Sequence, residues 1–156
     1  MTPRAPRYSS RALPATAFVP GVSPRGDRPA ASPRPATVDL DALATDDDFR
    51  FGVDLYNHGF PWEAHEAWEP LWFAAPRDRP ERALLQGLIH AAAAAVKART
   101  GALDAARGLV ASACGYLRRA GADTGVLDVP ALVAALTGWA EDPARPAPLI
   151  TLPPRS

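Results

Sequence analysis

The sequence predicts an all-α protein: a compact bundle of about five helices, preceded by an extended arm rich in proline and arginine. Two observations predict this class. After residue 45, apolar residues recur at the three- and four-residue spacing of a helix face, and no segment alternates apolar and polar residues as a half-buried strand does. The chain has 156 residues, of which 47% are hydrophobic, which is enough for one domain with a single core.

Residues 1–44 are predicted to form the arm. The stretch 1–38 holds eight prolines and six arginines against one acidic residue, and proline both fixes φ and lacks the N–H that a helix interior needs. An arginine-rich, acid-poor N-terminus is also typical of organelle transit peptides. The rest of the chain is mildly acidic, which argues against nucleic acid as a partner because phosphate recognition needs a basic face.

The first two helices are predicted from their boundary residues. Thr45, with Asp48 three residues later, resembles a helix-capping pair, and Gly59 supplies the stop. The second helix has Pro61 in its first turn, where the missing N–H costs nothing. Pro70 is expected to bend the last turn of this helix.

Three further helices complete the predicted bundle. The apolar segment 82–100 is expected to be the central helix, because five consecutive alanines let neighbours approach closely. Residues 103–120 form the fourth helix, and the fifth begins near residues 128–130. Residues 143–156 follow this helical domain, which spans residues 45–142, as an extended tail that packs on the bundle.

Cysteine content and hydropathy limit the cellular compartments in which the protein is expected. The single cysteine, Cys114, excludes an internal disulfide and favours a reducing compartment, so a cytoplasmic location is expected. The longest nearly apolar run, residues 88–96, is much shorter than the roughly 20 residues that a bilayer requires. No membrane partner is expected, and a homo-oligomer is compatible with the sequence.

The most unusual segment runs from Asn57 to Trp72 and contains three of the four tryptophans and two of the three histidines. On a helical wheel its polar and aromatic side chains occupy roughly a third of the circumference. These are Trp62, His65, Glu66, Glu69 and Trp72, with Glu63 at the margin of the face. The face is predicted to meet Gln86 and His90 of the central helix in a polar pocket between the second and third helices, lined by Asn57, Trp62, Trp72 and Gln86.

One interpretation of this face is a divalent metal site, because imidazole and carboxylate groups are the ligands that such ions use. The string from His65 to Glu69 reads H-E-x-x-E, which differs from the zincin motif by one ligand type. The predicted metal ligands are Glu63, His65, Glu69 and His90. The predicted catalytic residues are Glu66, as general base on a bound water, and His65, in metal-assisted hydrolysis.

Two other interpretations stay open. Carboxylates in the first turns of a helix are stabilised by the helix dipole and need no metal to explain them. Alternatively, His65, Glu66, Gln86 and His90 form a buried hydrogen-bonded network that fixes helix register. In that case the tryptophan-rich surface receives a partner, and the protein is a non-enzymatic interaction module.

A longer pattern carries a family resemblance. The sequence F-G-V-D-L-Y-N-H-G-F-P-W-E-A-H-E at residues 51–66, followed by Trp72 and by Q-G-L-I-H at residues 86–90, resembles the bacterial family called domain of unknown function 309. The resemblance spans about residues 48–110 and implies a small all-α bundle. It also implies the label of predicted metal-dependent hydrolase. Residues 11–21 resemble the arm that precedes the domain in some members, which favours an arm over a transit peptide.

Overall fold

The computed structural model describes residues 5–20 and 38–154, and every regular element in this part of the chain is a helix. The all-α prediction is therefore confirmed. In chain order the helices are α1 (Leu40–Thr45), α2 (Asp47–Asn57), α3 (Pro61–Ala74), α4 (Pro80–Arg99), α5 (Leu103–Ala120) and α6 (Val129–Trp139).

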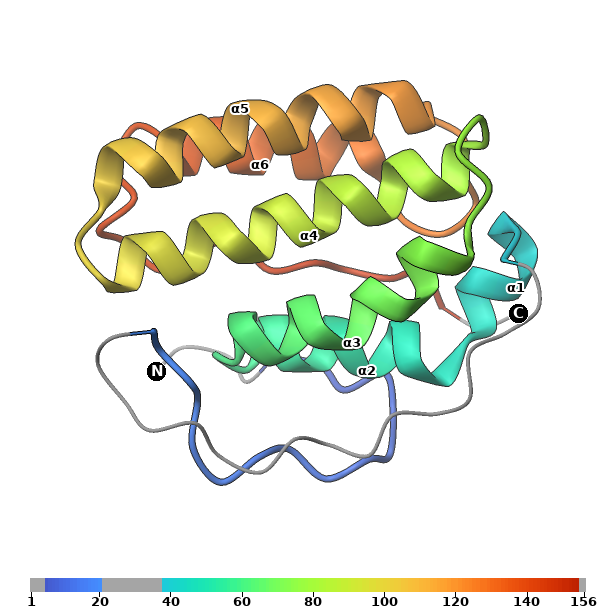
Figure 1. Ribbon diagram of the computed structural model, residues 1–156, viewed down its shortest axis with the longest axis horizontal. Helices are drawn as coiled ribbons and strands as arrows, with labels where there is room; N and C mark the ends of the chain where they lie inside the picture. The colour runs from blue at the N-terminus through green and yellow to red at the C-terminus, as the bar shows by residue number, and fades with distance from the viewer. Residues whose placement is uncertain (1–4, 21–37, 155–156) are drawn as a thin grey trace.

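The helices form two packed groups that meet at α4 (Figure 1). Helices α4 and α5 run side by side in opposite directions along the length of the molecule, and α6 packs on α5. Helices α2 and α3 form the second group, and α3 lies against α4. The central position of α4 was predicted from its alanine-rich sequence, and Ala91, Ala92 and Ala94 are indeed fully buried.

Helix α1 was not predicted, because its residues were assigned to the extended arm. The side chain of Asp39 accepts a hydrogen bond from the Ala42 N–H at 2.7 Å and so caps the helix. The helix buries Leu43 completely. A single helical turn with one buried leucine is too short to produce a periodic pattern, which is why the sequence did not reveal it.

The N-terminal boundary of α2 corrects one prediction. The N-cap of α2 is Asp46, whose carboxylate accepts from the Phe49 N–H at 2.8 Å, so the predicted capping role of Thr45 is wrong. Thr45 instead ends α1. Helix α3 continues through Pro70 to Ala74, because proline removes one hydrogen bond near the C-terminal end, where few turns remain to be broken.

Glycine allows two close contacts in the core. A Cβ atom on Gly52 would lie 2.2 Å from Trp68 Nε1, so α2 and α3 can approach this closely only because residue 52 has no side chain. The Trp68 indole is fully buried and donates to the Phe49 carbonyl at 3.2 Å. In the same way Gly87 of α4 accommodates Leu117 of α5, whose Cγ would be 2.7 Å from a Cβ at residue 87.

The arm is held by one buried carboxylate. Asp54 of α2 has no exposed surface and accepts hydrogen bonds from the Tyr8 N–H at 2.7 Å and the Ser9 N–H at 2.9 Å. The guanidinium of Arg7 pairs with the same carboxylate at 2.9 Å. Three donors from consecutive residues therefore fix the arm against α2.

The C-terminal segment is also extended and crosses the bundle behind α4 (Figure 1). Ile150 and Leu152 are buried in the common core. Among residues 5–20 and 38–154, no helix combines the length and the hydrophobicity that crossing a bilayer requires.

Candidate functional site

Helix α3 carries most of the predicted site residues. Its inner side is anchored by Trp68 and Leu71, both essentially buried, and its other sides carry the polar groups. Glu66 is half-buried and engaged in an interaction. Because α3 begins at Pro61, the polar residues lie in its first and middle turns.

Glu63 joins the helix to the arm. It is 7% exposed, and its Oε1 accepts from the Phe18 N–H at 2.6 Å. The Phe18 ring meets the Trp62 indole edge-on, with 5.0 Å between ring centroids. One carboxylate oxygen of this predicted metal ligand is therefore used to hold residue 18, while Oε2 is buried without a hydrogen-bond partner in the described chain.

His65 and Glu69 form a pair on the outer face of α3. The distance from His65 Nε2 to Glu69 Oε2 is 2.9 Å, and the two side chains are 28% and 41% exposed. A carboxylate only accepts, so Nε2 carries the proton, and a neutral His65 has a lone pair on Nδ1. That Nδ1 is buried and has no partner within the described residues. The Trp62 ring lies beside the imidazole at 5.4 Å.

Gln86 and His90 form a separate pair on α4. The Gln86 amide nitrogen lies 3.0 Å from His90 Nε2, and since an amide nitrogen only donates, Nε2 is the acceptor. His90 also packs edge-on against Tyr116 of α5 at 5.2 Å. Burial lowers the pKa of His90, which favours the neutral imidazole that this hydrogen bond requires.

The two pairs do not combine into one ligand set. Within residues 5–20 and 38–154, no three His, Cys, Asp or Glu side chains are grouped closely enough to hold a metal ion. Gln86 of the pair on α4 instead borders a cavity of about 300 Å³ between the loop before α4 and the end of α5, and His90 is not among the residues that line it. Four of the residues that line this cavity are arginines: Arg77, Arg79, Arg82 and Arg119.

The two tryptophans predicted to line a pocket each keep a buried indole N–H without a partner in the described chain. Trp62 lies between Phe18 and His65. Trp72 is covered by the Arg82 guanidinium at 3.9 Å from the ring centroid and touches Phe73. Trp62 therefore belongs to the surroundings of His65, whereas Trp72 is covered by a residue of α4.

Asn57 lies away from both pairs. Its side-chain amide donates to the Ile150 carbonyl and accepts from the Ile150 N–H, both at 2.8 Å. It also lines a different cavity, beside Tyr56. Its position at the end of α2 makes it the anchor of the C-terminal segment.

Sequence reasoning missed Asp54, Tyr56 and Arg50. Arg50 is 8% exposed and donates to the Tyr8 carbonyl at 2.9 Å, so it acts with Asp54 on the arm. The sequence held a signal for Arg50 and Asp54, because these two charged residues interrupt a segment, Phe49 to Tyr56, that is otherwise apolar. Buried charges require partners, and these partners come from the arm.

A known protein family matches the part of the chain that contains the His65–Glu69 and Gln86–His90 pairs. Residues 49–109 match the model of a family described as domain of unknown function (DUF309), which confirms the resemblance. The match covers α2, α3 and α4 and the first turns of α5. No curated protein and no solved structure matches the chain.

Proposed function

We propose that the protein is a small hydrolase and that its reactive group is the His65–Glu69 pair on α3, within the segment that matches the family. One observation carries the proposal. His65 Nε2 is bonded to a carboxylate, while Nδ1 is buried and unpartnered in the described chain. Carboxylate-oriented imidazoles of this kind serve as general bases in hydrolytic enzymes.

The proposed step is the activation, at Nδ1, of a water molecule that enters together with the substrate, because Nδ1 is buried in the free protein. The lone pair of Nδ1 accepts a proton from a water molecule as the water oxygen forms a bond to the substrate's ester carbon or phosphorus. Glu69 stabilises the resulting imidazolium through the Nε2 hydrogen bond. The bond between that carbon or phosphorus and the leaving oxygen then breaks as the imidazolium gives the proton on Nδ1 to this oxygen, which restores the neutral imidazole beside the Glu69 carboxylate.

Trp62 supports this assignment. Its ring lies beside His65 at 5.4 Å, and its indole N–H is an unpartnered donor in the described chain. A donor next to a general base is suited to the negative charge that develops on the substrate oxygen.

The sequence also predicted that the hydrolase depends on a metal ion. The ligands would be Glu63, His65, Glu69 and His90, but Glu63 already holds Phe18, and the Gln86 amide already uses the lone pair of His90 Nε2. No group of three ligands exists among the described residues. The proposed step therefore uses the imidazole of His65 and no metal ion.

The test is hydrolysis of nitrophenyl acetate and nitrophenyl phosphate by the full chain, with and without added Zn²⁺ or Mn²⁺. We expect His65→Asn to lower the rate roughly 10²–10⁴-fold, the contribution of a general base, and Glu69→Gln to lower it by a smaller factor. Glu66→Gln is the matched control on the same helix and is expected to retain activity.

Three outcomes would overturn the proposal. Loss of activity in Glu66→Gln with full activity in His65→Asn would assign the base to Glu66. Activity only with added metal would support the metal-dependent form instead. Absence of hydrolysis of both esters, together with a loss of thermal stability in His65→Asn, would identify the pair as a structural element of a binding module.

A further inference from the structure

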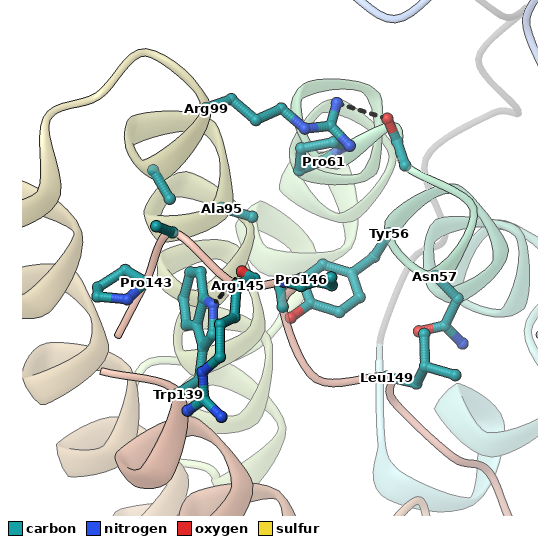
Figure 2. A pocket seen from close by; sticks show the side chains of 14 residues that line it. Tyr56, Asn57, Pro61, Ala95, Arg99, Trp139, Pro143, Arg145, Pro146 and Leu149 are labelled. Atoms are coloured by element: carbon teal, nitrogen blue, oxygen red, sulfur yellow. Dashed lines mark hydrogen bonds between the residues drawn. The ribbon is translucent and has the colours of Figure 1, made fainter. Parts of the chain in front are cut away.

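A second cavity, of about 390 Å³, lies on the side of the bundle where the C-terminal segment crosses α4 (Figure 2). Its walls come from the end of α2, the start of α3, the C-terminal half of α4, the end of α6 and residues 143–149. None of the residues in the His65–Glu69 pair lines it. Its volume lies within the range of small-molecule sites, about 300–1,000 Å³.

Tyr56 supplies a buried polar group to this cavity. The residue is 6% exposed, and its hydroxyl has no hydrogen-bond partner in the described chain. Figure 2 shows the ring reaching from α2 toward Pro146, with the hydroxyl at its inner end. Burial raises the pKa of Tyr56, so the group is a neutral O–H donor. An unsatisfied buried hydroxyl destabilises the folded protein, and a bound acceptor would remove this cost.

The walls around this hydroxyl are apolar. Ala95 of α4 and the prolines at 143 and 146 line the cavity together with Trp139 of α6. The indole N–H of Trp139 already donates to the Arg145 carbonyl at 2.9 Å. Trp139 therefore offers its ring and not its donor to a ligand, and this suits an apolar or aromatic body.

Two arginines give the cavity a positive rim. Arg99 donates one N–H to the Gly59 carbonyl at 2.7 Å (Figure 2), which fixes its guanidinium and leaves its other N–H groups for an anion. Arg145 also lines the cavity and lies 3.7 Å from Asp142, which is not among the lining residues. The lining contains no Asp or Glu, so no carboxylate of the cavity wall would repel an anion.

From these contacts we infer that the cavity binds a small aromatic carboxylate, with the ring against Trp139 and the prolines. The carboxylate would accept the hydrogen bond of the Tyr56 hydroxyl and would be attracted by the positive charge of Arg99 in the same lining. The inference is independent of the proposed hydrolysis, because the two sites share no residue.

The experiment measures the affinity of the full chain for phenylacetate and for phenylethanol, its uncharged counterpart, by NMR titration. We expect phenylacetate to bind more tightly. Tyr56→Phe should weaken the binding of phenylacetate roughly ten- to hundredfold, the equivalent of one hydrogen bond to a charged acceptor. Arg99→Gln should abolish the preference for the anion, while Arg119→Gln, at the other cavity, serves as the matched control and should preserve it.

Stability of the free protein provides a second readout. If the hydroxyl is unsatisfied without ligand, Tyr56→Phe will keep or raise the melting temperature; a clear decrease would show that the hydroxyl has a structural partner and would overturn the inference. Equal affinity for the two probes in the wild type would overturn it as well, as would failure of both to bind. Binding that neither Tyr56→Phe nor Arg99→Gln changes would place the ligand elsewhere.

Discussion

Asn57 and Ile150 are 93 positions apart in sequence and exchange two hydrogen bonds, each 2.8 Å long. The side-chain amide of Asn57 acts toward Ile150 as a neighbouring strand would, donating to its carbonyl and accepting from its N–H. This single residue at the end of α2 therefore fixes the register of the C-terminal segment. The same contact positions the segment that closes the cavity beside Tyr56.

Replacing this amide tests its role. Asn57→Ala leaves the N–H and the carbonyl of Ile150 without partners, and we expect the free energy of unfolding to fall by about 1–3 kcal/mol. Amide hydrogen exchange should accelerate at Ile150 and Leu152. Exchange at Tyr8 and Ser9, which are bonded to Asp54, provides the internal control and should remain slow. Uniform acceleration at both places would mean that Asn57 stabilises the whole domain and not the C-terminal segment.

The buried carboxylate of Asp54 makes a second prediction. Asp54→Ala removes the acceptor of two backbone N–H groups and the partner of Arg7, so we expect a loss of about 2–4 kcal/mol in urea unfolding. Limited proteolysis should then cut the arm.

The control for Asp54 is Asp47→Asn, because Asp47 also faces the arm, pairing with Arg11 at 3.3 Å, but is 65% exposed. An exposed pair of this kind contributes at most about 1 kcal/mol. Equal losses in the two variants would contradict the assignment of Asp54 as the anchor of the arm.

Two glycines in helices give opposite predictions for the same substitution. A Cβ at Gly52 would lie 2.2 Å from the buried Trp68 ring, whereas a Cβ at Gly108 of α5 meets nothing within 4 Å. Gly52→Ala should therefore destabilise the protein by roughly 1–3 kcal/mol or more, as overpacking of a core does. Gly108→Ala should stabilise it by about 0.5–1 kcal/mol, because alanine is the better helix former. Thermal unfolding of both variants checks this, and stabilisation by both would refute the close packing of α2 on α3.

The sequence was sufficient to predict α2 to α6, although not the short α1, because their apolar periodicity and their boundary prolines and glycines are local signals. It was less informative about the candidate site. The spacing of Glu63, His65 and Glu69 places them near one another on α3, but spacing within a helix says nothing of what packs against it. Glu63 contacts the arm through Phe18, and His90 contacts α5 through Tyr116, which are contacts between segments distant in sequence.

The cavity beside Tyr56 illustrates the same limit. Its residues come from five places between residues 56 and 149, and none of them forms a motif within a short window. In the sequence this tyrosine lies within the segment 51–66 that carries the family resemblance, and it shows no signal of a site of its own. Its significance depends on the segment that Asn57 holds across it, which periodicity does not reveal.

His90 predicts a pH dependence of stability. Burial lowers its pKa below the value of about 6.5 in the unfolded chain. The Gln86 amide and the Tyr116 ring face His90. The Arg119 guanidinium in turn lies 5.4 Å from the centroid of the Tyr116 ring. No carboxylate among these groups would stabilise the imidazolium.

The sign follows from proton binding. Above about pH 6.5 the imidazole is neutral in both states and adds no pH dependence. As the pH falls below this value, the unfolded chain takes up a proton that the folded chain does not, so the free energy of unfolding decreases until the pH passes the lowered pKa. His90→Gln removes this term, and its stability should decline less than that of the wild type between about pH 7.5 and about pH 5 in urea unfolding. Tyr116→Phe keeps the ring contact and should follow the wild-type curve. Parallel curves for the wild type and His90→Gln would show that His90 titrates alike in both states, and the neutral Gln86–His90 pair would have to be abandoned.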